Sequence, residues 1–167
     1  RLAVVGAASF LVCGAVAAAS HLAQPADDDG HGLEAALGNV AFVDEAGTPW
    51  RTWSEDAVAE ALDDGRVVFV DFTADWCTTC KVNERFVLHR PAVRELFDEL
   101  DVAAQVADWT RPDDRIQQAL AAQNKGGVPM YLVYGPAHPT EPVVLPEALT
   151  YEIVANAVRE ARGLPLP

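Results

Sequence analysis

The pattern of apolar and polar residues from residue 39 onward predicts alternating strands and helices. Residues 67–72 (VVFVDF) form a nearly continuous apolar run, which is typical of a strand buried on both faces of a sheet. Further strands are expected at 39–43, 50–53, 102–107, 130–134 and 142–145. Helical spacing of apolar residues predicts helices at 54–64, 77–88, 91–99, 112–123 and 150–163. This order predicts an α/β domain whose central mixed sheet carries helices on both faces.

The beginning of the chain has a different character. Residues 2–19 carry no charge, and a helix of that length, at about 1.5 Å per residue, comes close to spanning a bilayer's hydrocarbon core. Residues 1–23 are therefore expected to hold a transmembrane helix, either the last of a longer membrane domain or a signal anchor. A cleaved signal peptide and a buried Ala-rich helix are the alternatives. Residues 24–38 are expected to be a flexible linker to a globular domain at 39–167.

The charged residues of the chain limit which partners are expected and where in the cell the protein is expected to lie. The chain has 12 Lys or Arg and 25 Asp or Glu, a formal net charge of −13, which argues against nucleic acid as a partner. Arg1 precedes the apolar run, whereas Asp27, Asp28 and Asp29 follow it. The positive-inside rule then places Arg1 in the cytoplasm and the globular domain on the other side of the membrane.

The candidate chemistry lies in one Cys-x-x-Cys pair, Cys77 and Cys80. Cys77 comes just after the buried strand, at the start of the expected helix, where unpaired N–H groups and the helix dipole stabilise a thiolate. Cys80 lies one helical turn further on, so the two sulfurs can close a small disulfide ring. Cys77 is expected to be the more exposed nucleophile and Cys80 the buried resolving thiol. Cys13 lies alone in the apolar run and is expected to be a packing residue.

Three other positions could serve this pair. Asp71 lies inside the apolar strand, where burial would raise its pKa and suit proton exchange with Cys80; an exposed strand face is the alternative. Glu84, four residues after Cys80, shares a helix face with it and either tunes the local field or is a solvated residue. Val128-Pro129 follows a Gly-Gly pair and precedes a strand, a setting in which a cis peptide bond is expected; an ordinary trans loop proline is the alternative.

Residues 70–81 (VDFTADWCTTCK) resemble the active-site segment of the thioredoxin superfamily. In this resemblance Asp71 matches the buried acid, Trp76 the aromatic residue before the first cysteine, and residues 127–129 the cis-proline loop. Residues 74–84, with 107–110, 128–134 and 141–146, resemble more narrowly the C-terminal periplasmic domain of the bacterial transmembrane thiol:disulfide interchange reductases, the DsbD/ScsB-like proteins. The resemblance covers about residues 50–162. The dipeptide Thr78-Thr79 departs from the Gly-Pro of thioredoxin, so the reduction potential does not carry over.

The resemblance implies a thioredoxin-like fold and a thiol:disulfide oxidoreductase whose redox centre is the Cys77–Cys80 disulfide, with no other cofactor and no metal. It implies that the domain accepts electrons from a membrane domain and reduces disulfides of periplasmic proteins. Its location would be the bacterial inner membrane, with the thioredoxin-like domain on the periplasmic side. The residues implied to contact protein partners surround the cysteines, with Pro129 and Met130 as a contact wall: Trp76, Thr78, Thr79, Val128, Pro129 and Met130.

Three alternatives are also compatible with these residues. A membrane-tethered thioredoxin could serve cytochrome maturation or act as an oxidant or isomerase. A metal-binding module is less favoured, because structural zinc takes four ligands and the four histidines show no ligand spacing: His21, His31, His89 and His138. A non-redox interaction domain is less favoured because it would have no use for two cysteines in this context.

Overall fold

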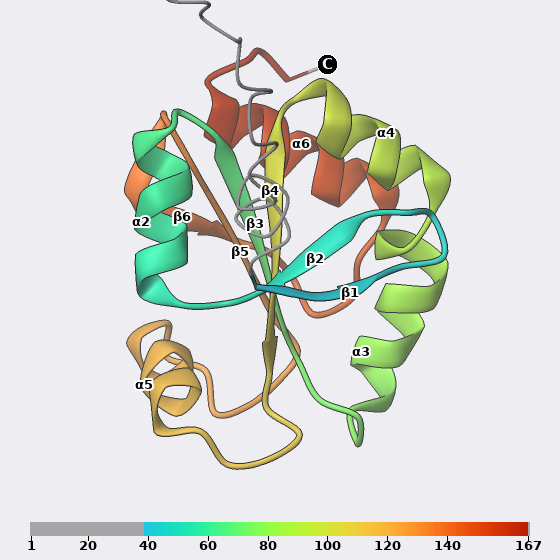
Figure 1. Cartoon of the computed structure of the whole chain (residues 1–167), viewed down its shortest axis with the longest axis vertical. Coiled ribbons are helices and arrows are strands. Elements are labelled where there is room, and N and C mark those ends of the chain that lie inside the picture. The colour runs from blue at the N-terminus through green and yellow to red at the C-terminus, as the bar shows by residue number, and fades with distance from the viewer. Residues whose placement is uncertain (1–38, 167) are drawn as a thin grey trace, which may run out of the picture.

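Strand β3 (Val67–Thr73) forms the centre of a six-stranded sheet in the computed structural model, which describes residues 39–166. All seven residues of β3 are buried, as its apolar run predicts. It pairs in parallel with β4 (Val102–Asp108) and antiparallel with β5 (Met130–Gly135). The strand order is β1-β2-β4-β3-β5-β6 (Figure 1). The sheet is therefore mixed, and the predicted α/β class is confirmed.

Shorter or more exposed strands form the two edges of the sheet. Strands β1 (Val40–Val43) and β2 (Pro49–Thr52) make an antiparallel hairpin, and β2 joins β4 through two residue pairs. At the other edge, β6 (His138–Val144) pairs antiparallel with β5. The sequence-based start of β6 at residue 142 was wrong because its first residues are largely exposed, so no apolar pattern marks them.

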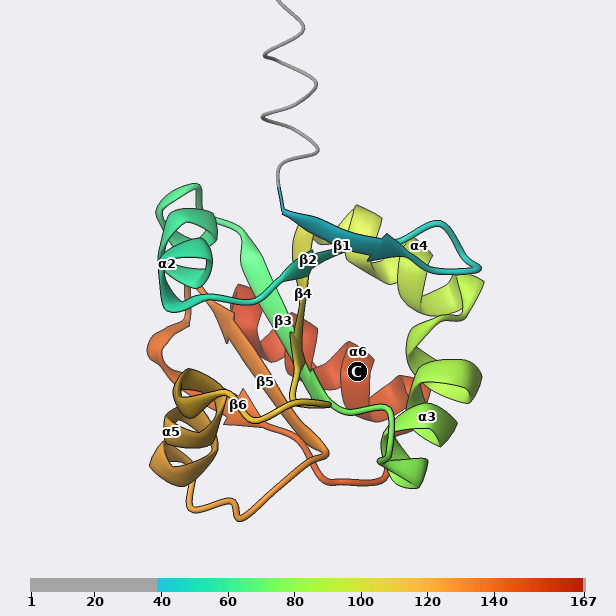
Figure 2. The same ribbon diagram turned by 60° about the horizontal axis from the view of Figure 1, so that its bottom comes forward.

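Helices cover both faces of the sheet, as predicted (Figures 1 and 2). Helices α2 (Glu55–Asp63) and α5 (Asp114–Ala122) lie on one face; α4 (Pro91–Glu99) and α6 (Tyr151–Arg162) lie on the other. The side chains of Ser54, Asp113 and Thr150 accept N–H bonds at the starts of α2, α5 and α6, which fixes where those helices begin. Two hydrophobic cores result, one on each side of β3.

The helix expected at 77–88 is built in two parts. Helix α3 (Thr78–Asn83) continues into a π-helical turn, η1 (Glu84–Leu88), which closes with the His89 N–H donating to the Glu84 carbonyl at 2.8 Å. The wider turn brings Asn83 and Leu88, five residues apart, to the buried side. The predicted extent of this helix was right, but the expectation of a regular α-helix with 3.6 residues per turn throughout was wrong.

The expected transmembrane helix within 1–23 and the linker at 24–38 lie outside the described residues. Within residues 39–166, no helix combines the length and the apolar character needed to cross a bilayer.

Candidate active site

Cys77 and Cys80 form a disulfide where β3 gives way to α3, with their Cα atoms 5.3 Å apart. Cys77 is the N-cap of α3, and its sulfur accepts the Cys80 N–H at 3.2 Å. After reduction the same N–H would stabilise a thiolate on Cys77. Cys77 is 7% exposed and Cys80 0%, so the sulfur that a partner can reach belongs to Cys77, in the order expected. Thr78 and Thr79, between the cysteines, are both exposed.

Trp76 stands at the rim of the disulfide. Its side chain is 59% exposed, and its ring lies 6.2 Å from that of Trp109, which follows β4. Backbone contacts hold the two loops together, since the Trp109 N–H donates to the Thr73 carbonyl at 2.8 Å and the Asp75 N–H to the Thr110 hydroxyl at 2.9 Å. Trp76 is thus placed where a partner approaching Cys77 would meet it.

The Val128–Pro129 peptide bond is cis, as the turn context predicts. Val128 is half-buried and packs against a small cluster made of Ala74, Cys77 and Cys80. The cis-proline loop is therefore in direct contact with the disulfide.

Met130 does not form the contact wall that the resemblance implies for its side chain. It is 1% exposed and belongs to the core that also contains Phe72, its partner across the β3–β5 ladder. Pro129 is buried as well. The physical reason is that β5 begins at Met130, so its side chain follows the inward direction of the strand. Val128 is the residue of this loop that remains open to a partner.

Asp71 is buried inside β3, and the exposed alternative is excluded, since the residue is 2% exposed. One carboxylate oxygen, Oδ1, has no hydrogen-bond partner in the structure. Burial raises the pKa of Asp71 well above its usual range; the Glu84 charge adds to the rise, and the Lys81 charge opposes it. An acid in this state can hold or release a proton beside the helix that carries Cys80.

Glu84 is not a solvated helix residue. Its side chain is 12% exposed, accepts a hydrogen bond from the Thr73 hydroxyl and receives the Lys81 ammonium at 2.9 Å. Thr73 ends β3, so this contact ties the strand carrying Asp71 to the helix carrying Cys80. Glu84 thereby sets the field around Asp71, which was one of its two expected roles.

Asn83 was missed by the sequence analysis. Its amide nitrogen donates to the Tyr131 hydroxyl at 2.8 Å and to the Glu147 carbonyl at 2.7 Å, and its oxygen accepts the Leu149 N–H at 3.2 Å. Burial raises the pKa of Tyr131, and the Asp71 charge adds to this. The available signal was position: Asn83 lies one turn after Cys80, so it shares the inward side of α3.

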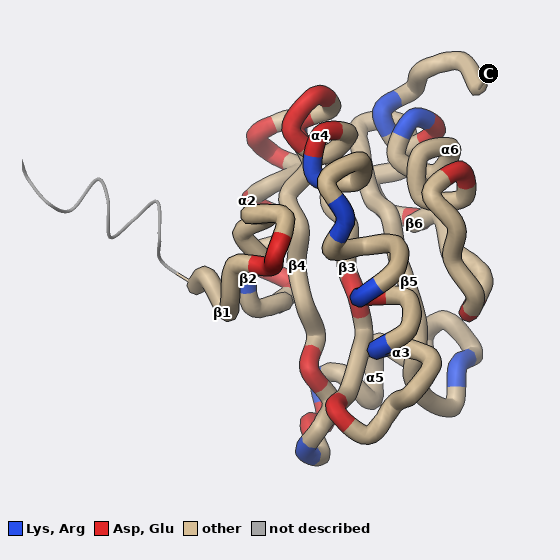
Figure 3. Tube along the Cα trace, turned by 90° about the vertical axis from the view of Figure 1, so that its right-hand side faces the viewer, with Lys and Arg blue, Asp and Glu red and all other residues tan. Residues whose placement is uncertain are grey.

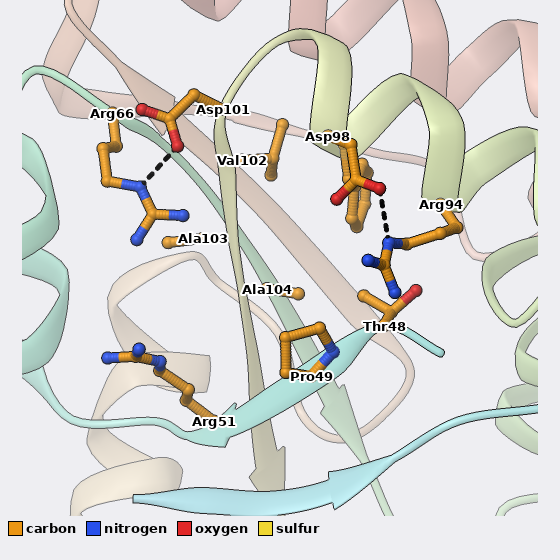
Figure 4. Close-up of a pocket in the computed structure, with 11 residues that line it drawn as sticks. Thr48, Pro49, Arg51, Arg66, Arg94, Asp98, Asp101, Val102, Ala103 and Ala104 are labelled. Atoms are coloured by element: carbon orange, nitrogen blue, oxygen red, sulfur yellow. Dashed lines mark hydrogen bonds and ion pairs between the residues drawn. The ribbon is translucent and has the colours of Figure 1, made fainter. Parts of the chain in front are cut away.

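A pocket of about 220 Å³ lies at the other end of the sheet, between β2, β4 and α4 (Figure 4). Arg66 and Arg94 line it and are bound to Asp101 at 3.0 Å and to Asp98 at 2.6 Å. Its β4 residues begin at Val102, whereas the disulfide follows Thr73, which pairs with Asp108 at the opposite end of β4. This pocket therefore takes no part in the disulfide site. Across residues 39–166, no cluster of three or more His, Cys, Asp or Glu side chains is arranged to hold a metal ion.

Comparison with known proteins identifies the architecture. A family model described as thioredoxin-like matches residues 49–136, more than half of the 167-residue chain. The chain belongs to the thioredoxin-like family. Its Cys77–Cys80 disulfide is the redox centre of that fold, and the domain is a thioredoxin-like thiol:disulfide oxidoreductase domain.

Curated relatives connect this thioredoxin-like chain to two groups. It is 37% identical over 62 residues to thioredoxin H9 of Arabidopsis thaliana and 36% identical over 75 residues to the thiol:disulfide interchange protein DsbD of Vibrio cholerae. A 38-residue match to DsbD 1 of Pseudomonas aeruginosa reaches 53% identity. These matches cover 37%, 45% and 23% of the chain and 41%, 12% and 6% of the relatives. The chain thus spans well under half the length of the curated relatives it matches.

Solved structures show the same fold. The reduced C-terminal domain of Neisseria meningitidis DsbD has a TM-score of 0.51 at 23% identity, covering 64% of this chain and 92% of that domain. A thioredoxin from Thermus thermophilus has a TM-score of 0.54 at 22% identity, covering 68% and 87%. The thioredoxin-like domain therefore resembles the C-terminal domain of DsbD in fold as well as in local sequence.

Proposed function

We propose that this domain donates electrons to disulfide-containing proteins outside the cytoplasm. In this proposal a membrane electron-transfer domain reduces the Cys77–Cys80 disulfide, and the reduced pair then reduces periplasmic partners. Residues 2–19 would anchor the domain on the periplasmic side of a bacterial inner membrane. The observation that carries the proposal is the disulfide itself, in which Cys77 is the more exposed residue, at 7% against 0% for Cys80, and a buried acid lies in the strand that leads to it. The local identity to two DsbD proteins supports the direction and the location.

The reaction is thiol–disulfide exchange. The Cys77 thiolate attacks a partner disulfide, and the resulting mixed disulfide is resolved when Cys80 attacks the Cys77 sulfur. Asp71 takes the proton from Cys80 for that second step, because it is a carboxylate of raised pKa beside this helix. Trp76, Thr78 and Thr79, all exposed, contact the partner chain around the sulfur.

The deciding experiment is the equilibrium reduction potential of the Cys77–Cys80 pair, titrated in a thiol redox buffer with Cys77→Ser as the control. A value of about −230 to −270 mV is expected, since this range suits a donor of electrons to other thiol proteins. A value of about −120 to −180 mV would instead assign the domain to disulfide oxidation or isomerisation. Absence of any reversible pair would overturn the redox function as a whole.

A membrane-tethered thioredoxin for cytochrome maturation is the second candidate, favoured by the match to a plain thioredoxin over 62 residues. A Cys80→Ser variant separates the two, because it cannot resolve the mixed disulfide on Cys77 and therefore retains its partner. Capture of a membrane domain with its own cysteine pair supports the first function. Capture of an apocytochrome or of a cytochrome-maturation thiol protein supports the second.

A further inference from the structure

The outer side of α3 and η1 carries large apolar side chains that nothing in the described chain covers. Trp76, Val82 and Phe86 are 59%, 49% and 65% exposed; Trp76 lies in the turn before α3, and Val82 and Phe86 follow four residues apart along α3 and η1. Figures 1 and 2 both place α3 at the edge of the molecule, with no other described element over its outer side. Trp76, Val82 and Phe86, together with Arg85 and Arg90, are called here the α3–η1 face.

This face is basic within an acidic protein. Between Cys77 and Arg94 the sequence holds four Lys or Arg and a single acidic residue, although the whole chain has a net charge of −13. Figure 3 shows these basic positions following one another along α3 and into α4. The net charge of residues 77–94 is therefore positive, whereas that of the whole chain is negative.

Two of the four basic side chains are free for a partner. Lys81 is bound to Glu84 and lies 3.9 Å from Asp75, and Arg94 is bound to Asp98. Glu45 lines the same pocket as Lys81 and Arg85. Arg85 and Arg90 are exposed and form no ion pair with any residue in the range 39–166; Arg85 lies over the Phe86 ring at 5.5 Å. His89 adds no charge, because burial lowers its pKa and it packs between Phe42 and Trp50.

We propose that the α3–η1 face docks an acidic, apolar-centred surface on the protein that exchanges its disulfide with Cys77. The inference rests on the proposed oxidoreductase function and names the chemistry of its partner. Exposed aromatic and arginine side chains are the types that dominate binding energy in protein interfaces. Asp75, after β3, and Asp108, at the end of β4, are exposed and acidic, and Asp75 lies 3.9 Å from Lys81. The positive charge open to an acidic partner is therefore that of Arg85 and Arg90, farther along the α3–η1 face.

A protein surface fits this face better than a membrane. A bilayer lying on Trp76 would cover the approach to the Cys77 sulfur, which exchange with a protein requires. Trp76 directly precedes Cys77, so a partner bound to this face is held close to the reacting sulfur.

Docking changes the rate at which the partner meets the Cys77 sulfur, and the exchange reaction itself stays the same, with bonds, electrons and protons in balance. The Cys77 thiolate forms a bond to one partner sulfur and the partner's S–S bond breaks; the Cys80 thiolate then displaces that sulfur. Two electrons pass from the Cys77–Cys80 pair to the partner. The two protons lost by the cysteines are taken up by the partner's two thiolates.

The test uses the purified, reduced protein and two synthetic peptides of equal length, each closed by one disulfide. One peptide flanks its cysteines with Asp, Glu and Leu, and the other replaces the acidic residues by Lys. At an ionic strength of about 0.1 M, where the Debye length of about 10 Å screens the net charge of the whole chain more than local contacts, we expect the acidic peptide to be reduced roughly tenfold faster, because complementary charge raises the association rate. Added salt should shrink this advantage. The double variant R85E/R90E should reverse the preference, and R85Q/R90Q should weaken it.

Two controls separate the possible failures. The double variant R159E/R162E makes the same charge change near the end of α6 and should keep the wild-type preference. Hydroxyethyl disulfide, which carries no charge, reports on the exchange chemistry alone.

If that compound is reduced but both peptides react equally, or if R85E/R90E still prefers the acidic peptide, the docking proposal is wrong and the oxidoreductase function stands. If no disulfide is reduced, the proposed function fails. Equal peptide rates, combined with sedimentation on phosphatidylglycerol vesicles that R85E/R90E abolishes, would assign the face to a membrane.

Discussion

Asp71 is an acid placed where an ionised carboxylate is costly, and the proposed mechanism gives it the role of proton acceptor. We expect Asp71→Asn to slow resolution of the mixed disulfide roughly a hundredfold, because an amide cannot take the Cys80 proton. Stopped-flow measurement of exchange with a disulfide peptide checks this. Asp75→Asn, an exposed change in the same segment, is the matched control and should stay within about twofold. Equal rates for both variants would remove Asp71 from the mechanism.

The raised pKa of Asp71 also predicts how stability depends on pH. The folded protein holds this proton more tightly than the unfolded chain, in which the carboxyl titrates with its ordinary pKa of 3.8. The stabilising contribution is therefore complete below that pH and is lost as the pH rises through the folded-state pKa. Asp71→Asn should match the wild type near pH 4 and exceed its free energy of unfolding by about 1–3 kcal/mol at pH 8. Urea titrations at the two pH values test it; a pH-independent difference would contradict it.

Asn83 connects α3 to the segment leading into α6 through three hydrogen bonds. Asn83→Leu should lower the free energy of unfolding by about 2–4 kcal/mol, because it leaves the buried Tyr131 hydroxyl and Leu149 N–H without partners. The neighbouring exposed change Val82→Ala should cost less than about 0.5 kcal/mol. The urea midpoints of the two variants make the comparison, and similar midpoints would mean that this network does not stabilise the fold.

Individual residues differ in how far the sequence reveals them. Cys77, Cys80 and Asp71 were predictable, because a Cys-x-x-Cys pair after an apolar strand and an acid inside that strand are both local patterns. The partners of Asn83 lie 48 to 66 residues away, so no local pattern reports them. Met130 was misjudged because the resemblance marked the loop but not which side chains of the loop point inward.

At the scale of elements, β5 and α6 pack closely at Gly135. A Cβ atom added at Gly135 would come within 2.4 Å of the Ala161 carbonyl oxygen. Gly135→Ala should therefore lower the free energy of unfolding by about 1–3 kcal/mol, since strand or helix must move. Gly126→Ala meets nothing within 4 Å and should be neutral or slightly stabilising. Thermal unfolding of the two variants tests the contrast, and equal melting temperatures would show that the two elements can separate freely.

Most helices and strands were predictable because the sequence of each contains residues that begin it, residues that end it, and a regular spacing of apolar side chains. Helix α4 occupies the predicted residues, beginning at Pro91, and α6 ends at Gly163 in the left-handed conformation that glycine favours. The π-helical turn was not predictable, since it follows from packing Leu88 into the core five residues after Asn83. The exposed start of β6 was not predictable either, because strand pairing rather than burial defines it.

At the scale of the whole molecule, the two cores and the disulfide all depend on one strand. β3 is buried along its length, is hydrogen-bonded to β4 on one side and β5 on the other, and leads directly into the active-site loop. By contrast, β1 pairs only with β2 and is mostly exposed. Strand β1 can therefore separate from the sheet without moving β3, which supports the active site.

This arrangement has a consequence for slow dynamics. In deuterated solvent, the backbone amides of β3 should be the last to exchange, at a rate set by global unfolding, while those of β1 exchange through local opening. Native-state exchange read out by NMR checks this order, and faster exchange in β3 than in β1 would contradict it. Because Asp71 belongs to β3, the proposed proton acceptor would be lost only when the entire domain unfolds, so fluctuations elsewhere would leave the disulfide site intact.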